Sequence, residues 1–226
     1  MTVHPFRQVD VFTNGPFTGN PLAVVHDADD VSTDEMQTIT RWTNLSEAAF
    51  LMQPTVPGAD YLVRIFEPKT ELPFAGHPTL GACAAWLDAG GVPREPGVVV
   101  QECGAGLVKI KRTAEGLAFA APPTLRHEPI ADDDLQRALD ALGLARSDLV
   151  ASHWIDNGPA GWGCCSPTPN ECWPSARRSD DISTSTSAWP ACTPTMPAAT
   201  ARSTWSAADI WVGGAVDVRI SGSIDL

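Results

Sequence analysis

A long stretch of the chain, Gly161 to Ser206, contains no Leu, Val or Phe and only one Ile, Ile182. Ser, Thr, Pro, Ala, Cys and Trp fill this stretch, and its tryptophans follow neither a helical nor a strand period. Such a composition buries too little apolar surface to offset the conformational entropy that is lost when the chain becomes ordered. The hydrophobic core must therefore come from the flanking residues, and we expect 161–206 to be irregular or poorly ordered.

The flanking residues show an α+β pattern. Asn20–Val25 is typical of a buried strand, and Ser32 with Glu35 forms a capping box that starts a helix. That helix is predicted to turn Met36, Ile39 and either Trp42 or Thr43 inward. Three further alternating segments form an antiparallel meander: Val98–Glu102, Leu107–Arg112 and Leu117–Ala121. Pro122-Pro123 separates them from a second helix, which the aspartates Asp132, Asp133 and Asp134 begin and Gly143 ends. We expect two domains, 1–121 and 122–226.

The segment Glu71–Gly81 joins an alternating strand, Tyr61–Phe66, to a helix that we expect from about Thr79 to Ala89. Pro78 suits the first helical position, and Gly90-Gly91 suits the end. The free N–H groups of the first turn and the helix dipole attract an anion near Gly76 and His77. A substrate carboxylate would fit there, although a lone His more often only caps a helix.

Composition excludes several function classes. The net charge of −12 leaves no electrostatic footprint for nucleic acid or an anionic membrane. No apolar run reaches the roughly 18 residues of a membrane span, and the N-terminus lacks a signal-peptide core, so we expect a cytoplasmic protein. The six cysteines contain no C-x-x-C pair and no His at zinc-finger spacing, which argues against a metal site. No motif for a nicotinamide, flavin or pyridoxal cofactor occurs.

Glu47 is the candidate acid/base. It precedes the apolar strand Ala48–Leu51, and burial would raise its pKa toward neutrality, which suits a group that takes and returns a proton. From the residues alone a solvated Glu remains the more common case, since Glu is seldom fully buried.

Together these motifs resemble a known family. N-L-S-E-A-A-F at 44–50 and E-L-P-F-A-G-H-P-T-L-G at 71–81 follow D-V-F and G-N-P-L-A-V-V upstream. This order is similar to that of the PhzF-like phenazine-biosynthesis isomerases, whose fold resembles diaminopimelate epimerase. The resemblance runs from about Gln8 to Asn157 and returns at Asp209–Leu226. It implies two pseudo-symmetric halves, each an antiparallel sheet curled around a helix, with the active site in the cleft between them.

The resemblance also implies roles for individual residues. Glu47 matches the general acid/base, and His77 helps to hold the substrate and to move the proton. Gly76, Pro78 and Thr79 match the anion-binding segment. Asp10 and Asn20 match the family pattern too, but an Asp beside a strand and an Asn before Pro are ordinary turn-supporting residues. Arg64 alternates outward as a surface residue does. The implied reaction needs no cofactor, its partner is a small carboxylated substrate, and a homodimer is expected.

The second half departs from the family. The D-P-x-T-G-S-like motif that completes the site in related proteins is absent from this sequence. A catalytically inactive remnant or small-anion-binding protein therefore stays open beside an active isomerase, and the substrate is not determined. We interpret Gly161–Ser206 as an out-of-frame product, with a deletion before Asp209, because a one-base shift with GC-rich codons can restore apolar strand patterns at 161–174 and 182–197. The second half would then lack part of its core.

Overall fold

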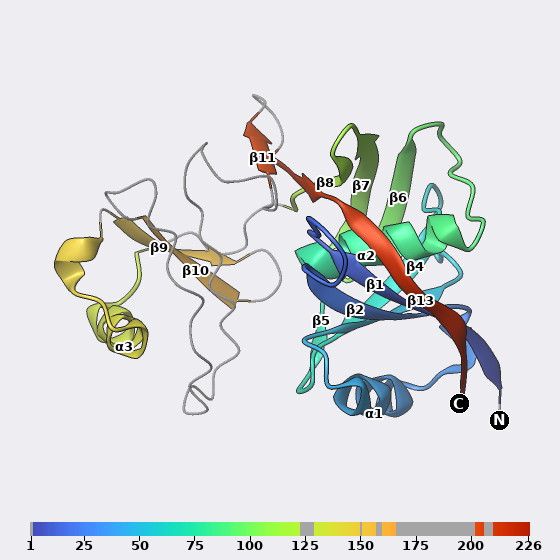
Figure 1. Cartoon of the computed structure of the whole chain (residues 1–226), viewed down its shortest axis with the longest axis horizontal. Helices are drawn as coiled ribbons and strands as arrows, with labels where there is room; N and C mark the ends of the chain where they lie inside the picture. Colours follow the sequence, from blue (N-terminus) through green and yellow to red (C-terminus); the bar gives the residue numbers. More distant parts are fainter. Residues whose placement is uncertain (1, 123–128, 150, 157–159, 166–201, 206–209) are drawn as a thin grey trace. The chain divides into compact units, whose positions relative to one another are not determined.

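The computed structural model describes residues 2–122, 129–149, 151–156, 160–165, 202–205 and 210–226. The chain divides into two compact units (Figure 1). The first unit combines Met1–Pro122 with Ala198–Leu226, and the second is Pro123–Pro197. The structure therefore differs from the predicted division into 1–121 and 122–226. The C-terminal strands belong to the first unit because they pair with its sheet, which sequence order alone does not reveal.

A single curled sheet forms most of the first unit. Its strands in spatial order are β11 (Arg202–Trp205), β12 (Ile210–Gly214), β8 (Gly116–Ala120), β7 (Gly106–Thr113), β6 (Val98–Cys103), β4 (Tyr61–Phe66), β3 (Ala48–Met52), β2 (Asn20–Val25), β1 (Val3–Val11) and β13 (Val216–Asp225), with the short β5 (Glu71–Leu72) beside β4. The pairs β2–β3 and β4–β6 are parallel and the other described pairs are antiparallel. The sheet is thus mixed, whereas the sequence predicted an antiparallel one.

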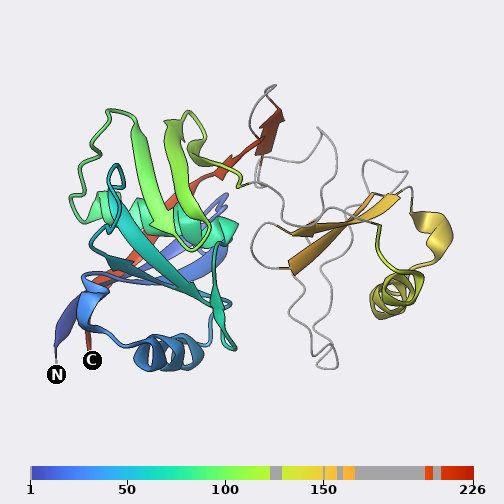
Figure 2. The same cartoon turned by 180° about the vertical axis from the view of Figure 1, so that it is seen from behind.

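The last strands bring the two ends of this sheet together. β12 pairs with β8, and β13, which begins two residues after β12 ends, pairs with β1. One continuous segment therefore bridges the two ends, and the sheet wraps around α2 (Gly76–Asp88), as Figures 1 and 2 show. This confirms the predicted sheet curled around a helix for the first unit.

The core of the first unit has two layers. Leu22 and Val24 of β2 belong to the cluster around α2, whereas Ala23 and Val25 pack with Met36 and Ile39 of α1 (Thr33–Thr43). β2 and β3 are therefore covered on both faces, which explains why their sequences are continuously apolar. α2 approaches the sheet closely at Gly81, where an added Cβ would lie 2.6 Å from Leu22 Cδ2.

The helix boundaries follow local signals, with two differences. Ser32 and Glu35 form the predicted capping box, with Ser32 Oγ accepting from the Glu35 N–H at 3.3 Å. Trp42, however, is 78 % exposed, and Thr40 is the buried residue of that helical turn. α2 begins at Gly76, three residues earlier than predicted, so Pro78 is its third residue. Pro costs no hydrogen bond there either, because the first N–H groups of a helix have no intrahelical acceptor.

The described part of the second unit contains the predicted helix, α3 (Asp132–Leu142), which Gly143 ends in the left-handed conformation. Leu135 and Leu139 are buried, together with Ile130. The hairpin β9 (Ala151–Asp156) and β10 (Ala160–Cys165) follows the short η2 (Arg146–Asp148). Within the stretch predicted to be irregular, 161–165 and 202–205 are strands, and the remainder lies outside the described residues.

Candidate active site

The turn between α1 and β3 positions Glu47. Asn44 ends α1 in the left-handed conformation with φ 56°, which Asn adopts more readily than most residues. Ser46 and Glu47 follow, and β3 begins at Ala48. The Glu47 side chain is only 18 % exposed. Burial raises the pKa of its carboxyl, the neighbouring Ser46 hydroxyl lowers that pKa in part, and the negative charge of Glu67 raises it. Glu47 is therefore mostly buried, which differs from the solvated position that is more common for Glu and suits a carboxyl of raised pKa.

His77 is the second residue of α2, and its side chain is almost completely buried. Burial lowers the pKa of the imidazole to about 3, so His77 is neutral at pH 7. Its Nε2 lies 3.6 Å from Glu47 Oε2. The structure therefore brings together two residues that are 30 positions apart in the sequence. A neutral imidazole beside a carboxyl of raised pKa is an arrangement in which a proton can be taken up and returned near neutral pH.

Neither Glu47 Oε2 nor His77 Nε2 has a hydrogen-bond partner within the part of the chain that the structure describes, although both atoms are buried. Their separation of 3.6 Å exceeds a hydrogen bond. Buried polar atoms are nearly always paired, and exceptions often have a catalytic or ligand-binding role. The pair is therefore the strongest candidate for the reacting groups.

The first turn of α2 supplies two backbone donors beside this pair. The first intrahelical bond runs from the Thr79 N–H to the Ala75 carbonyl at 3.1 Å, so the N–H groups of Gly76 and His77 precede it. No acceptor for either N–H is found among the described residues. Two free donors at the positive end of a helix suit an anion such as a carboxylate.

Three predicted binding residues have structural roles. A Cβ at Gly76 would lie 3.1 Å from Phe119 Cζ, so the missing side chain makes room for the Phe119 ring. Pro78 is buried and donates no N–H group. Thr79 is fully buried, and its Oγ1 accepts from Gln101 Nε2 at 3.0 Å, in a chain that continues to Tyr61. Both polar groups of Thr79 are engaged inside the protein, so the structure does not support a substrate contact for Thr79.

Asn20 and Asp10, the other two residues that match the family pattern, lie in β2 and β1. Ser46 Oγ donates to Asn20 Oδ1 at 3.4 Å, which links Asn20 to the turn that carries Glu47. Asp10 is buried and accepts from the Thr18 N–H at 3.1 Å, which agrees with the structural role predicted for it. The Arg219 Nε lies 3.7 Å from Asp10 Oδ2. Sequence reasoning missed Arg219, because no local signal links two residues that far apart.

Arg64 was predicted to be a surface residue, but only 24 % of its side chain is exposed, and it forms two hydrogen bonds to the Glu71 carboxylate at 2.7 and 2.6 Å. In the described ranges, no three His, Cys, Asp or Glu side chains are grouped as metal ligands require. Among the helices that the structure describes, none combines the length and the apolar character of a membrane span.

Comparison with known proteins shows the family of the chain. The sequence profile of the PhzC-PhzF family, described as phenazine biosynthesis-like protein, matches residues 9–160. The chain belongs to this family. The match covers Glu47 and His77 and ends where the aliphatic residues disappear from the sequence.

Two curated relatives and one solved structure show the extent of the likeness. Antisense-enhancing sequence 1 of Schizosaccharomyces pombe is 42 % identical over 166 residues, which is 70 % of this chain and 56 % of the relative. Trans-2,3-dihydro-3-hydroxyanthranilate isomerase of Pseudomonas chlororaphis is 49 % identical over 83 residues, 37 % of this chain and 30 % of that protein. A structure described as a predicted epimerase from Pseudomonas aeruginosa shares the fold, with a TM-score of 0.73 at 20 % identity over 98 % of this chain and 99 % of that one. The chain thus spans about half the length of the first curated relative and less than a third of the length of the second.

Proposed function

We propose that this protein is a cofactor-independent isomerase or epimerase that moves a proton between carbon atoms of a small carboxylated metabolite. The observation that carries the proposal is the buried Glu47–His77 pair, with 3.6 Å between the facing atoms. Membership of the PhzC-PhzF family supports it, since the relative from Pseudomonas chlororaphis is named an isomerase of trans-2,3-dihydro-3-hydroxyanthranilate. That compound, or another small acid with an acidified C–H bond, is the substrate class.

Glu47 performs the proton transfer in this mechanism. Its carboxylate accepts a proton from one carbon, so that the electron pair of the broken C–H bond moves into the conjugated system of the substrate. The resulting carboxylic acid exchanges its proton with the solvent and delivers a proton to a second carbon, so that no atom or electron is gained or lost. The raised pKa of Glu47 brings the two protonation states closer in free energy, which favours transfer in both directions.

His77 and the helix N-terminus position the substrate. A neutral His77 offers a hydrogen bond at Nε2, as donor or acceptor according to its tautomer, without adding a charge that would fix Glu47 as a carboxylate. The N–H groups of Gly76 and His77 bind the substrate carboxylate. Each group is supplied by the first unit. The homodimer expected from the resemblance remains a proposal that light scattering of the purified chain would test.

A second candidate is a small-anion-binding protein without turnover. It is favoured by one observation, the absence of a D-P-x-T-G-S-like motif from the sequence. Such a protein would keep the donors at the start of α2 but lack groups that complete the reaction in relatives. Binding with no proton exchange distinguishes it from the isomerase.

The test is incubation with trans-2,3-dihydro-3-hydroxyanthranilate in heavy water, followed by mass spectrometry. An isomerase incorporates one deuterium per turnover at carbon. Glu47→Gln keeps the shape of the side chain and removes its acid/base function, so the rate should fall by about 10²–10⁴-fold. Glu115→Gln makes the same chemical change at an exposed turn and should leave the rate unchanged.

Two results would contradict the proposal. Equal deuterium incorporation by the Glu47→Gln variant would show that another group transfers the proton. No incorporation by the unmodified chain, together with saturable binding of the substrate, would favour the anion-binding alternative.

A further inference from the structure

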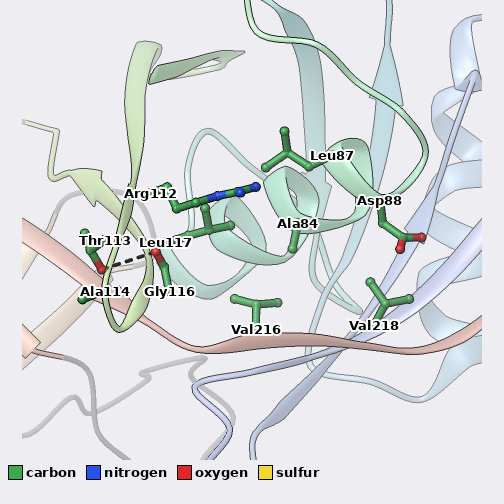
Figure 3. A pocket seen from close by; sticks show the side chains of 10 residues that line it. All are labelled: Ala84, Leu87, Asp88, Arg112, Thr113, Ala114, Gly116, Leu117, Val216 and Val218. Carbon is green, nitrogen blue, oxygen red and sulfur yellow. Dashed lines mark hydrogen bonds between the residues drawn. The ribbon is translucent and has the colours of Figure 1, made fainter. Parts of the chain in front are cut away.

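A cavity of about 500 Å³ lies beside the C-terminal half of α2, away from His77 at the start of the helix. Figure 3 shows its walls: Leu87 and Asp88 on α2, Arg112 and Ala114 on the β7–β8 hairpin, and Val216 and Val218 on β13. All of these residues belong to the first unit. The volume falls within the range of about 300–1,000 Å³ that is typical of small-molecule sites.

The hairpin wall has a fixed backbone. Thr113 Oγ1 donates to the Gly116 carbonyl at 3.3 Å, which closes the turn between the two strands. Gly116 has φ +130°, and an added Cβ would lie 2.3 Å from the Gly214 carbonyl oxygen. Only Gly fits at this position, so the wall is held by close contact of two backbones. The cavity is thus part of the folded unit and does not depend on a flexible loop.

Arg112 is the one basic residue in the lining of this cavity. Among the arginines that the structure describes, six pair with carboxylates: Arg7, Arg64, Arg94, Arg137, Arg146 and Arg219. No carboxylate lies within ion-pair distance of Arg112 in the described residues. Arg41 and the lysines Lys69, Lys109 and Lys111 also form no ion pair among the described residues, so what distinguishes Arg112 is that it lines a cavity.

The guanidinium of Arg112 is directed into the cavity. Figure 3 shows it extending from the hairpin toward Leu87 of α2. Burial raises the pKa of the Cys83 thiol on α2 to about 12, and the positive charge of Arg112 acts on that thiol in the opposite direction. Two observations thus place the unpaired cation near α2, above an apolar surface formed by Leu87, Val216 and Val218.

The lining indicates one chemical class of ligand. A guanidinium binds a carboxylate through two parallel hydrogen bonds, and the apolar walls suit a hydrophobic body. A second negative charge is disfavoured, because Asp88 also lines the cavity and its carboxylate is already bonded to Arg7 Nε at 2.8 Å. We propose that this cavity binds a small organic acid with one carboxylate on Arg112 and an apolar body against α2 and β13, at a site separate from Glu47 and His77.

The test uses the full chain with labelled Leu and Val methyl groups and 4-fluorobenzoate as the probe, followed by NMR titration. Binding should shift the methyl signals of Leu117, Val216 and Val218, which line the cavity. Arg112→Met should weaken this binding at least about tenfold, the loss expected for a charge-assisted hydrogen bond. Neutral 4-fluorobenzamide should bind the unmodified chain more weakly than 4-fluorobenzoate does, by a similar factor.

Lys109→Met is the matched control, because Lys109 is an exposed cation on the same strand that does not line the cavity. It should leave the affinity unchanged. Ala114→Glu adds a carboxylate to the lining and should weaken binding as Arg112→Met does. Three results would overturn the proposal. The shifts could be confined to methyl groups near Glu47, or Lys109→Met could weaken binding as much as Arg112→Met does. The chain could also respond to inorganic phosphate but not to 4-fluorobenzoate.

Discussion

His77 makes the stability of the first unit depend on pH in a way that can be calculated. The pKa of its imidazole is about 3 in the folded chain, compared with 6.5 for an exposed His. Between these two values the unfolded chain holds a proton that the folded chain does not. Stability is therefore fully present above pH 6.5 and is lost as the pH falls toward 3. Each pH unit in this window costs about 1.4 kcal/mol, so about 2 kcal/mol should be lost by pH 5.

The substitution that tests this is His77→Gln, which keeps a polar side chain but cannot titrate. The difference in unfolding free energy between the unmodified chain and this variant should shrink by about 2 kcal/mol from pH 7 to pH 5. Urea unfolding followed at the methyl signals of Leu22 and Val24, which pack around α2, would report on the first unit alone. Taking the difference cancels every other group that titrates equally in both proteins.

The contribution of Glu47 to the pH dependence of stability must be separated from that of His77, because the raised pKa of Glu47 acts in the opposite sense. Its folded form holds a proton above pH 4.5 that the unfolded form has lost, so stability from this group falls as the pH rises through that window. The comparison is therefore repeated in a Glu47→Gln background, where the slope from His77 should persist. Parallel curves for the chain and the His77→Gln variant between pH 7 and 5 would refute the reasoning.

Three further predictions concern packing and the gene. Gly81→Ala should destabilise the first unit by about 1–3 kcal/mol in urea unfolding, because its Cβ would lie 2.6 Å from Leu22 Cδ2, whereas Gly222→Ala, with nothing within 4 Å, should have little effect. Thr79→Val should cost about 1–3 kcal/mol by leaving the buried Gln101 amide without its acceptor, while Thr38→Val on the exposed face of α1 should cost less than about 0.5 kcal/mol. Resequencing the gene should reveal a frame change that begins near codon 160 and is compensated before codon 210; an intact frame shared by close relatives would contradict this.

Local signals predicted the elements of the fold well. The capping box at Ser32, the strand Asn20–Val25 and the left-handed Gly143 each depend on residues a few positions apart, and all three are present. It is harder to predict whether a residue near the end of a helix lies on the buried or on the exposed face. Either Trp42 or Thr43 was expected inside; Trp42, at the last turn of α1, is 78 % exposed, whereas Thr43 is half-buried.

The candidate site was predictable only in part. Glu47 and His77 were found through the resemblance of two motifs, and the structure adds that their side chains meet. Thr79 was placed in the anion-binding segment by the same resemblance, but its N–H donates to the Ala75 carbonyl and its hydroxyl accepts from Gln101, which lies on a distant strand. The contact of Arg219 with Asp10 likewise joins opposite ends of the chain. Such contacts depend on the sheet closing, and no sequence window contains both partners.

The C-terminal strands show that the residues after Asp209 are in the frame that the fold uses. Val212, Val216 and Val218 pack against the core around α2, which accounts for the apolar alternation that returns there. An added Cβ would lie 2.5 Å from the Leu117 carbonyl oxygen at Gly213 and 2.6 Å from Phe12 Cδ1 at Gly214. Two adjacent positions thus need glycine, and glycine occupies both. A shifted frame would rarely meet these requirements, so any shift in 161–206 must be compensated before β12 begins.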